Sequence, residues 1–387
     1  MSSPPPTAIV VGAGIGGLTA AAALRRTGYQ VRIFERATDL LPTGSALALT
    51  CNASVALRQM GIELNLDGRA VQWDRLHFKS AAGQVIRTIH YRHFIQEFGV
   101  PMLAVHRADL QQALLEQVGE ESVTLGATAT GYDIDGDQVQ VTFSDGHTVR
   151  GDVLIGADGI RSAIRRQLLG PEELRDGDYI CWLATPHFTH TRVTPGYAAH
   201  YWGRGRRFGL ADIGNGRVYW WGTMNMPGEA ARTWKGDREE IERTYAGWAD
   251  EVGAVLRATP EDTIITIPAQ DRPFRGSWGT GPVTLLGDAA HPMMTSLGQG
   301  AAMAVEDGVV LAQCLAGADT ISAGLRAYED ARRPRTHQMV QASYALSRIE
   351  QAEHPLAVLG RRVYFRWVPQ RSIDARNRAA LTFQGAS

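Results

Sequence analysis

The stretch AIVVGAGIGGLTAAAALRR, residues 8–26, decides which fold the sequence predicts. Its apolar beginning, 8–11, is typical of a buried strand, and its alanine-rich end, 18–26, is typical of a helix. A turn joins the two and contains Gly12, Gly14, Gly16 and Gly17. Such glycines let bare backbone approach a pyrophosphate, and the helix N-terminus stabilises the phosphate charge. The stretch therefore predicts the first strand, turn and helix of a dinucleotide-binding unit.

The segment that follows agrees with this prediction. Residues 30–34 have the pattern of a second buried strand, and Glu35 and Arg36 come directly after it. In proteins with this motif, an acidic residue at about this distance from the glycines accepts hydrogen bonds from the adenosine ribose. We therefore expect Glu35 and Arg36 to contact the cofactor. The glycine turn by itself does not distinguish FAD from NAD.

The composition excludes several classes of function. The 387 residues are 44% hydrophobic and 20% charged, and the formal net charge is −1. These values give no reason to expect nucleic acid or a membrane as a partner, and no stretch approaches the roughly 18 apolar residues of a membrane span. Cys51, Cys181 and Cys314 lie far apart, so we expect no disulfide framework, no metal site and a cytoplasmic location. A monomer and a homodimer both stay open.

Two further glycine-bearing motifs lie far along the chain from the first. GADGIRS, residues 156–162, follows an apolar strand and opens a basic helix. GDAAHP, residues 287–292, is followed by GQGA, residues 298–301. The order of these motifs resembles that of the single-component FAD-dependent monooxygenases, the aromatic hydroxylases of the para-hydroxybenzoate hydroxylase type. The resemblance extends over residues 8–345.

The resemblance implies a non-covalently bound FAD and a set of residues that contact it. Asp288 is expected to accept hydrogen bonds from the ribityl hydroxyls, and Arg107 to reach the phosphate or ribityl region. The N-terminus of the helix near Gly300 is expected to face the part of the flavin where negative charge collects on reduction. The other contacts that the resemblance implies are Ala48, Ala129, Asp158, Gly298, Gln299, Gly300, Ala301 and Ala302.

The predicted fold class is α/β, with a GxGxxG Rossmann-like FAD-binding domain built on a parallel sheet. It is interleaved with an antiparallel-sheet substrate domain, in which strand patterns at 207–213 and 217–223 flank Gly214-Asn215-Gly216. A second hairpin is predicted over 138–143 and 148–153. The expected boundaries are 7–75, 98–178 and 271–345 for the FAD-binding domain, 76–97 and 179–270 for the substrate domain, and 346–387 for a C-terminal helical tail.

The resemblance also implies a reaction that the cofactor carries out. NAD(P)H reduces FAD, dioxygen adds at C4a of the flavin, and the hydroperoxide hydroxylates or epoxidises an aromatic or other electron-rich small molecule. The sequence has no second GxGxxG motif, so the nicotinamide is expected to visit the flavin transiently. Three alternatives stay open: a flavin-dependent dehydrogenase or reductase on the same fold, a non-enzymatic nucleotide-binding protein, and a plain NAD-dependent dehydrogenase.

The segment 179–223 is rich in aromatic residues, which suit a flat-walled substrate pocket. Arg207 and Tyr219 lie where the urate-oxidising members of the family carry a substrate-binding arginine and tyrosine. Both are therefore candidates for anchoring or deprotonating an acidic hydroxyl. Ser296 replaces the acidic residue that accompanies them in those members, which argues against urate as the substrate. Thr295 replaces the proline that relatives usually carry above the flavin.

Overall fold

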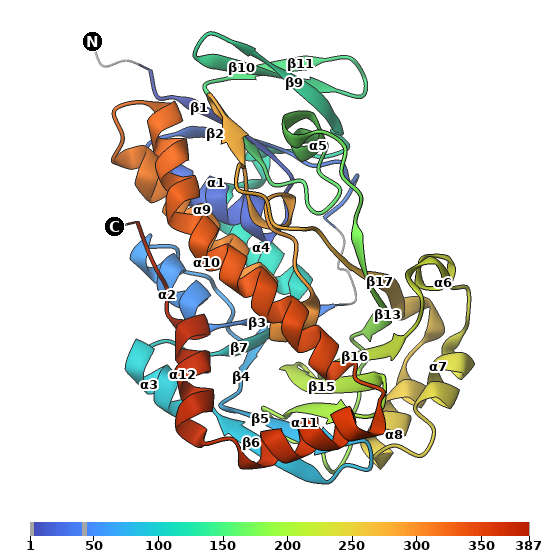
Figure 1. Cartoon of the computed structure of the whole chain (residues 1–387). Helices are drawn as coiled ribbons and strands as arrows, with labels where there is room; N and C mark the ends of the chain where they lie inside the picture. The colour runs from blue at the N-terminus through green and yellow to red at the C-terminus, as the bar shows by residue number, and fades with distance from the viewer. Residues whose placement is uncertain (1–3, 41–44, 387) are drawn as a thin grey trace.

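The computed structural model describes residues 4–40 and 45–386 (Figure 1). A parallel sheet lies at one end of the molecule and a larger sheet at the other. The long helix α10 (Ile321–Glu350) runs across one face from the first end toward the second. Within the described ranges, every helix is too short or too polar to span a bilayer.

The parallel sheet confirms the predicted α/β class. Its strand order is β18-β19-β12-β1-β2-β8, and all neighbours run parallel except β18 and β19. The strands are β1 (Thr7–Val11), β2 (Gln30–Phe34), β8 (Val123–Thr124), β12 (Val153–Gly156), β18 (Gly279–Thr280) and β19 (Val283–Leu285). Because β1, β12 and β19 are parallel and adjacent, the loops that follow them meet at one edge of the sheet.

Three helices pack together beside this sheet: α1 (Ile15–Arg26), α4 (Arg107–Val118) and α9 (Gly300–Ala316). Small side chains let α1 and α9 approach closely, and a Cβ on Gly308 would lie only 2.7 Å from the backbone nitrogen of Ala20. Helix α1 begins before Leu18, the predicted start, because the Leu18 amide already donates a hydrogen bond to the Gly14 carbonyl.

A separate antiparallel sheet contains β9 (Ala129–Asp135), β10 (Gln138–Phe143) and β11 (Thr148–Gly151). The predicted second arm of this hairpin, 148–153, is wrong at its end, because β11 stops at Gly151 and Val153 already belongs to the parallel sheet. The Asp152 carboxylate accepts a hydrogen bond from the Thr7 amide at 2.7 Å. This bond holds the chain where it crosses from one sheet to the other.

The larger sheet is antiparallel apart from one parallel pair, β5 and β14, and its order is β17-β13-β16-β15-β14-β5-β6. The strands are β5 (Arg75–Ser80), β6 (Val85–His90), β13 (Arg175–Ala184), β14 (Ala198–Trp202), β15 (Arg206–Gly214), β16 (Arg217–Asn225) and β17 (Ile265–Asp271). The predicted hairpin around Asn215 is confirmed as β15 and β16.

The two faces of the larger sheet are covered differently. Helices α6 (Gly228–Thr233), α7 (Arg238–Thr244) and α8 (Asp250–Ala258) cover one face, and Trp182 and Trp220 belong to the core beneath them (Figure 1). Side chains alternate along a strand, so Arg207, Tyr219 and Trp221 lie on the opposite face. That opposite face is not covered by α6, α7 and α8.

The remaining elements connect the two larger sheets and close the chain. A small antiparallel sheet has the order β3 (Ala46–Leu49), β7 (Leu103–His106), β4 (Ala70–Gln72). Three shorter helices are α2 (Cys51–Gln59), α3 (Arg92–Phe98) and α5 (Ala163–Leu169). The C-terminal part is helical, with α11 (Pro355–Trp367) and α12 (Gln370–Leu381) after α10.

Candidate functional site

The three glycine-bearing motifs meet at the turn between β1 and α1. A Cβ on Gly12 would lie 2.4 Å from the Ala157 carbonyl oxygen in the second motif. A Cβ on Gly16 would lie 2.7 Å from Cδ2 of Leu286, which directly precedes the third motif. Gly12 also has a φ of +108°, which other residues rarely adopt. Gly12 and Gly16 are therefore needed so that the three segments can pack together.

Gly14 and Gly17 have different surroundings. A Cβ on Gly17 would lie 2.0 Å from the Gly12 carbonyl oxygen, so Gly17 is required by the turn itself. A Cβ on Gly14 would meet no atom within 4 Å. Gly14 is the N-cap of α1, so the free amides at the start of this helix lie beside open space. This combination suits a phosphate group.

Glu35 ties the turn to the end of β2. Its carboxylate accepts hydrogen bonds from the Ala13 amide at 2.8 Å and from the Ala37 amide at 3.0 Å. The Glu35 carbonyl accepts a bond from the Ala127 amide, which brings the chain just before Ala129 next to it. Arg36 is exposed, and Ala129 is buried on β9. These residues therefore surround the end of β2, as an adenosine site would require.

Asp158, in the second motif, has one oxygen engaged and one free. Oδ2 accepts hydrogen bonds from the Ala163 amide at 2.7 Å and the Ile164 amide at 3.4 Å, at the start of α5. Oδ1 is buried and has no partner among the described residues. Burial raises the pKa of this carboxyl, and the bonds to the helix act in the opposite direction. Asp158 thus fixes α5 and leaves an acceptor for another group.

Asp288, in the third motif, faces open space, which is called the recess below. Its side chain is exposed, although Gly287 and Ala289 on either side of it are buried. Desolvation by the surrounding protein raises the pKa of its carboxyl, while the charges of His291 and Arg107 oppose this effect. Arg107, the first residue of α4, is therefore close enough for its charge to act on Asp288. The resemblance implies that both residues contact the same ligand.

The start of α9 presents bare backbone beside the third motif. Gly298 has a φ of +63°, and a Cβ on it would meet no atom within 4 Å. A Cβ on Gly300 would contact only Cγ of Met293, at 3.9 Å. The Gln299 side chain is buried and accepts a hydrogen bond from Nδ2 of Asn52 at 3.1 Å. Ala301 is half-buried, Ala302 is buried, and Ala48 lies half-buried on β3.

His291 anchors the third motif to α9. Its Nε2 lies 2.5 Å from Oδ2 of Asp307, and Nε of Arg332 donates to Oδ1 of the same carboxylate at 2.7 Å. All three side chains are buried. Burial alone would raise the pKa of Asp307, but His291 and Arg332 lower it to about 2. His291 therefore holds the loop in place through Nε2.

Arg207 and Tyr219 lie on the face of the larger sheet away from α6, α7 and α8. Arg207 is buried, donates a hydrogen bond to Glu350 through Nη1, and has Nη2 3.4 Å from Oγ1 of Thr295. Thr295 belongs to the segment just before α9, so Arg207 connects the sheet to the recess. Burial raises the pKa of the Tyr219 hydroxyl. The hydroxyl therefore stays protonated near neutral pH and cannot accept a proton as a base.

Two buried residues beside Arg207 were not predicted from the sequence. Glu350 ends α10, and burial raises the pKa of its carboxyl against the charge of Arg207. Nδ1 of His200 lies 3.9 Å from Oε1 of Glu350, and burial lowers the pKa of His200 to about 3. The signal for Glu350 is its spacing: it continues a buried stripe of α10 that includes Ser343 and Ser347.

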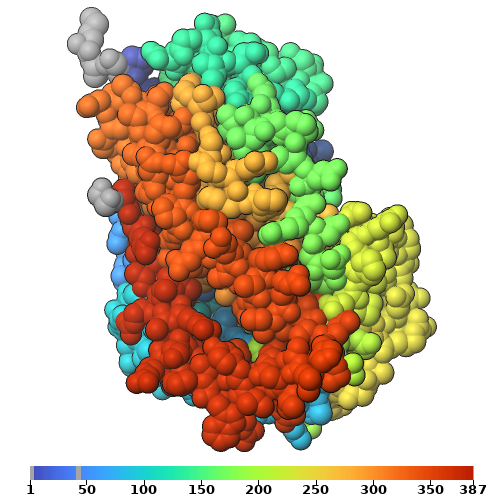
Figure 2. Space-filling model, viewed as in Figure 1, coloured from blue at the N-terminus to red at the C-terminus, as the bar shows by residue number. Residues whose placement is uncertain are grey.

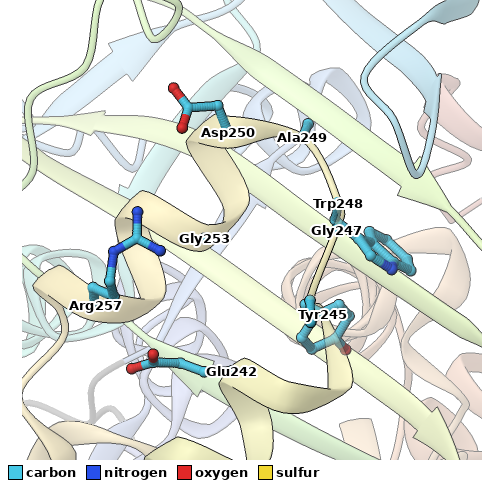
Figure 3. A pocket seen from close by; sticks show the side chains of 9 residues that line it. Glu242, Tyr245, Gly247, Trp248, Ala249, Asp250, Gly253 and Arg257 are labelled. Atoms are coloured by element: carbon cyan, nitrogen blue, oxygen red, sulfur yellow. The ribbon is translucent and has the colours of Figure 1, made fainter.

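A surface pocket lies apart from all of these residues (Figure 3). It is formed by α7, α8 and the chain between them, and Glu242, Trp248 and Arg257 are among its lining residues. The Tyr245 hydroxyl lies 3.1 Å from the backbone oxygen of Arg207, on the side of the sheet away from the Arg207 side chain. The sheet therefore separates this pocket from the recess.

A glycine turn at a helix N-terminus, an acidic residue after the second strand and a recess lined by Asp288 together define a dinucleotide-binding flavoprotein. The chain belongs to the family described as FAD binding domain, whose model matches residues 6–343. FAD is therefore its cofactor, and the residues around the recess fit that group: open backbone at Gly14 and Gly298, and free acceptors at Asp158 and Asp288.

Relatives of known activity cover most of the chain. It is 35% identical to the aurachin C monooxygenase/isomerase of Stigmatella aurantiaca, over 97% of this chain and 98% of that protein. It is 34% identical to the chloroplastic zeaxanthin epoxidase of Solanum lycopersicum over 84% of this chain, but this match spans about half of the relative, 52%. The crystal structure of Klebsiella pneumoniae HpxO complexed with FAD and uric acid matches 97% of each chain, with 28% identity and a TM-score of 0.89.

Proposed function

We propose that this chain is an FAD-dependent monooxygenase that uses NAD(P)H and dioxygen to hydroxylate or epoxidise an aromatic or other electron-rich small molecule. The observation that carries the proposal is the meeting of three motifs at one recess, which Arg207 and Thr295 connect to the aromatic face of the larger sheet. The monooxygenase and epoxidase activities of relatives at 35% and 34% identity support it.

The residues around the recess would hold FAD at three points. Glu35 would accept hydrogen bonds from the adenosine ribose, and the amides after Gly14 would face the pyrophosphate. Asp288 would accept hydrogen bonds from the ribityl hydroxyls, with Arg107 near the phosphate or ribityl region. Bound FAD supplies the redox chemistry, taking a hydride from NAD(P)H and then activating dioxygen.

The N-terminus of α9 has an electrostatic role in this proposal. Its first amides have no intrahelical partners, and the positive end of the helix dipole lies beside the open backbone of Gly298 and Gly300. A negative charge that develops in the recess during reduction would be stabilised there. The anchoring of His291 by Asp307 would keep this helix end in position.

Arg207 and its neighbours would bind the polar part of the substrate. Nε of Arg207 and Nδ1 of His200 are buried without a hydrogen-bond partner among the described residues. Buried polar groups are normally satisfied, so unpartnered ones that cluster at one place favour a ligand with hydrogen-bonding groups. Because Glu350 already balances the charge of Arg207, a neutral polar substituent suits the site better than a free anion.

Isotopically labelled dioxygen tests the proposal. The purified chain, supplied with NADH or NADPH and a panel of phenols and N-heteroaromatic compounds, is expected to build one labelled oxygen atom into a product detected by mass spectrometry. Consumption of NAD(P)H with unlabelled product would instead establish the flavin-dependent dehydrogenase or reductase. If no compound accelerates NAD(P)H oxidation by the flavin-loaded protein, the result would favour a non-enzymatic nucleotide-binding protein.

A further inference from the structure

Helix α11 exposes an apolar stripe on its outer face. Leu356, Leu359, Val363 and Trp367 follow one another at the spacing that places them on one side of a helix. Their exposed fractions are 70%, 57%, 49% and 74%. Only four of the ten large hydrophobic residues exposed in the described part of the chain lie outside residues 349–367. The apolar surface of the protein is therefore concentrated at this helix.

The inner face of α11 is firmly attached, so the stripe is a fixed surface. Arg361 is buried, donates to the Gly203 carbonyl at 2.8 Å and lies 5.0 Å from the centre of the Trp202 ring. The Phe365 ring lies 4.7 Å from that of Trp202. Arg87 donates to the Val368 carbonyl at 2.7 Å, just after the helix ends. These contacts fix which side of α11 faces outward.

Unpaired arginines flank the stripe. Arg362, Arg366 and Arg371 are exposed and form no ion pair with any residue of the described ranges. Residues 354–387 contain six arginines and one acidic residue, Asp374, although the whole chain has a formal net charge of −1. The net charge of the whole chain, which gave no reason to expect a membrane partner, therefore does not reflect the strongly basic segment around α11.

We propose that α11 is an interfacial helix that seats the protein on an anionic lipid surface. An exposed apolar stripe flanked by arginines is the pattern of helices that lie in the plane of a membrane interface. Trp367 and Tyr364 add the aromatic side chains that prefer the headgroup level. The helix does not need to cross the bilayer, so the length of the helices places no restriction on this mode of binding.

The arginines also distinguish a lipid surface from a second copy of the chain. A symmetric dimer formed through the stripe would bring Arg362 and Arg366 of the two copies close together, and like charges at an interface are destabilising. Anionic headgroups would instead compensate these charges. Charge complementarity therefore favours the lipid surface.

Helix α11 borders an opening in the surface of the protein (Figure 2), so contact with a lipid surface would bring that opening close to the membrane. Figure 2 shows a hollow framed by α10, α11 and α12, with earlier parts of the chain visible at its floor. A lipid surface under α11 would lie beside this opening, so an apolar substrate could enter from the membrane. This last step rests on the proposed monooxygenase function, whereas the docking of α11 does not.

Vesicle co-sedimentation tests the docking. The FAD-loaded full chain is mixed with vesicles of equal parts phosphatidylcholine and phosphatidylglycerol, and with pure phosphatidylcholine vesicles. We expect binding to the anionic vesicles that weakens in salt, and an affinity at least about tenfold lower for the double variant Leu359→Ser/Trp367→Ser. The variant Arg362→Gln/Arg366→Gln is expected to lose the preference for anionic vesicles.

The control is Leu125→Ser/Ile134→Ser, which removes exposed apolar side chains outside α11 and should bind like the unchanged protein. Equal binding by the α11 variant and this control would overturn the proposal, as would absence of binding to anionic vesicles. Light scattering without vesicles identifies the rival: a dimer that Leu359→Ser/Trp367→Ser dissociates would assign the stripe to a second copy. Flavin absorbance of the same samples reports separately on the FAD site.

Discussion

The charge of Arg207 is balanced within the protein by a residue of a distant helix. The guanidinium is paired with Glu350, which lies 143 positions further along the chain. Arg207 lies on β15, whereas Glu350 is the last residue of α10. The consequence is chemical: Arg207 is a charge-balanced hydrogen-bond donor rather than a free cation.

Replacing Glu350 by glutamine tests this pair. The variant leaves the buried Arg207 without a counter-ion, so the free energy of unfolding should fall by about 3–5 kcal/mol. Urea denaturation followed by tryptophan fluorescence measures the change. The matched control is Glu353→Gln, because Glu353 is exposed and its loss should cost less than about 1 kcal/mol. Equal midpoints for the two variants would contradict the account.

At the scale of elements, the strand, turn and helix at residues 8–26 were predictable because they are local. Each depends on neighbours in sequence, and the glycines reveal the turn. The parallel pairing of β5 with β14 could not be predicted, because it joins segments about a hundred residues apart that have no connecting helix motif. The end of β11 was missed because only contact with β1 decides where the chain leaves the hairpin.

The glycine turn supports a paired prediction. Gly12→Ala should destabilise the protein, because the new Cβ would lie 2.4 Å from the Ala157 oxygen at a positive φ. Gly14→Ala should leave the melting temperature nearly unchanged, since its Cβ would meet no protein atom, yet weaken FAD binding by filling the space beside the helix amides.

Thermal unfolding of the two apo variants, followed by titration with FAD, separates these effects. Loss of stability in both variants, or unaltered FAD affinity in Gly14→Ala, would show that the turn has only a packing role. Gly28→Ala is less suitable as a control because Gly28 has a φ of +92°.

At the scale of the whole molecule, stability should depend on pH in two steps. Burial lowers the pKa of His200 from 6.5 to about 3, so the unfolded chain takes up this proton first and stability falls as the pH drops below about 6.5. The pKa of Asp307 is lowered from 3.8 to about 2, so a second loss begins below about pH 4 as the unfolded carboxyl becomes protonated.

The midpoint of urea unfolding, measured between pH 7 and pH 3, checks both steps. His200→Asn should reduce the slope between pH 6.5 and pH 4, where the lowered pKa values of His77 and His106 also contribute. Asp307→Asn should reduce the slope only below about pH 4, where the lowered pKa of Glu251 also contributes. A slope between pH 6.5 and pH 4 that is as steep in His200→Asn as in the unchanged protein would contradict the role given to His200.

The molecule as a whole could be predicted further than its substrate site. Three glycine-bearing motifs define the cofactor end because their chemistry requires glycine and aspartate at fixed places. The proposed substrate site combines Arg207 from β15, Thr295 from the segment before α9 and Glu350 from α10, none of which has a motif of its own. Their proximity follows only from packing, so the sequence could not indicate it.

The central claim is that one recess, lined by Asp288, binds FAD. The most direct measurement is the FAD affinity of Asp288→Ala, titrated by flavin fluorescence beside the unchanged chain and the control Asp319→Ala, whose carboxylate is exposed between α9 and α10. Loss of hydrogen bonds to a charged acceptor predicts an affinity about 10–100-fold lower for Asp288→Ala and no change for Asp319→Ala. An Asp288→Ala protein that binds FAD as tightly as the unchanged chain would contradict the account.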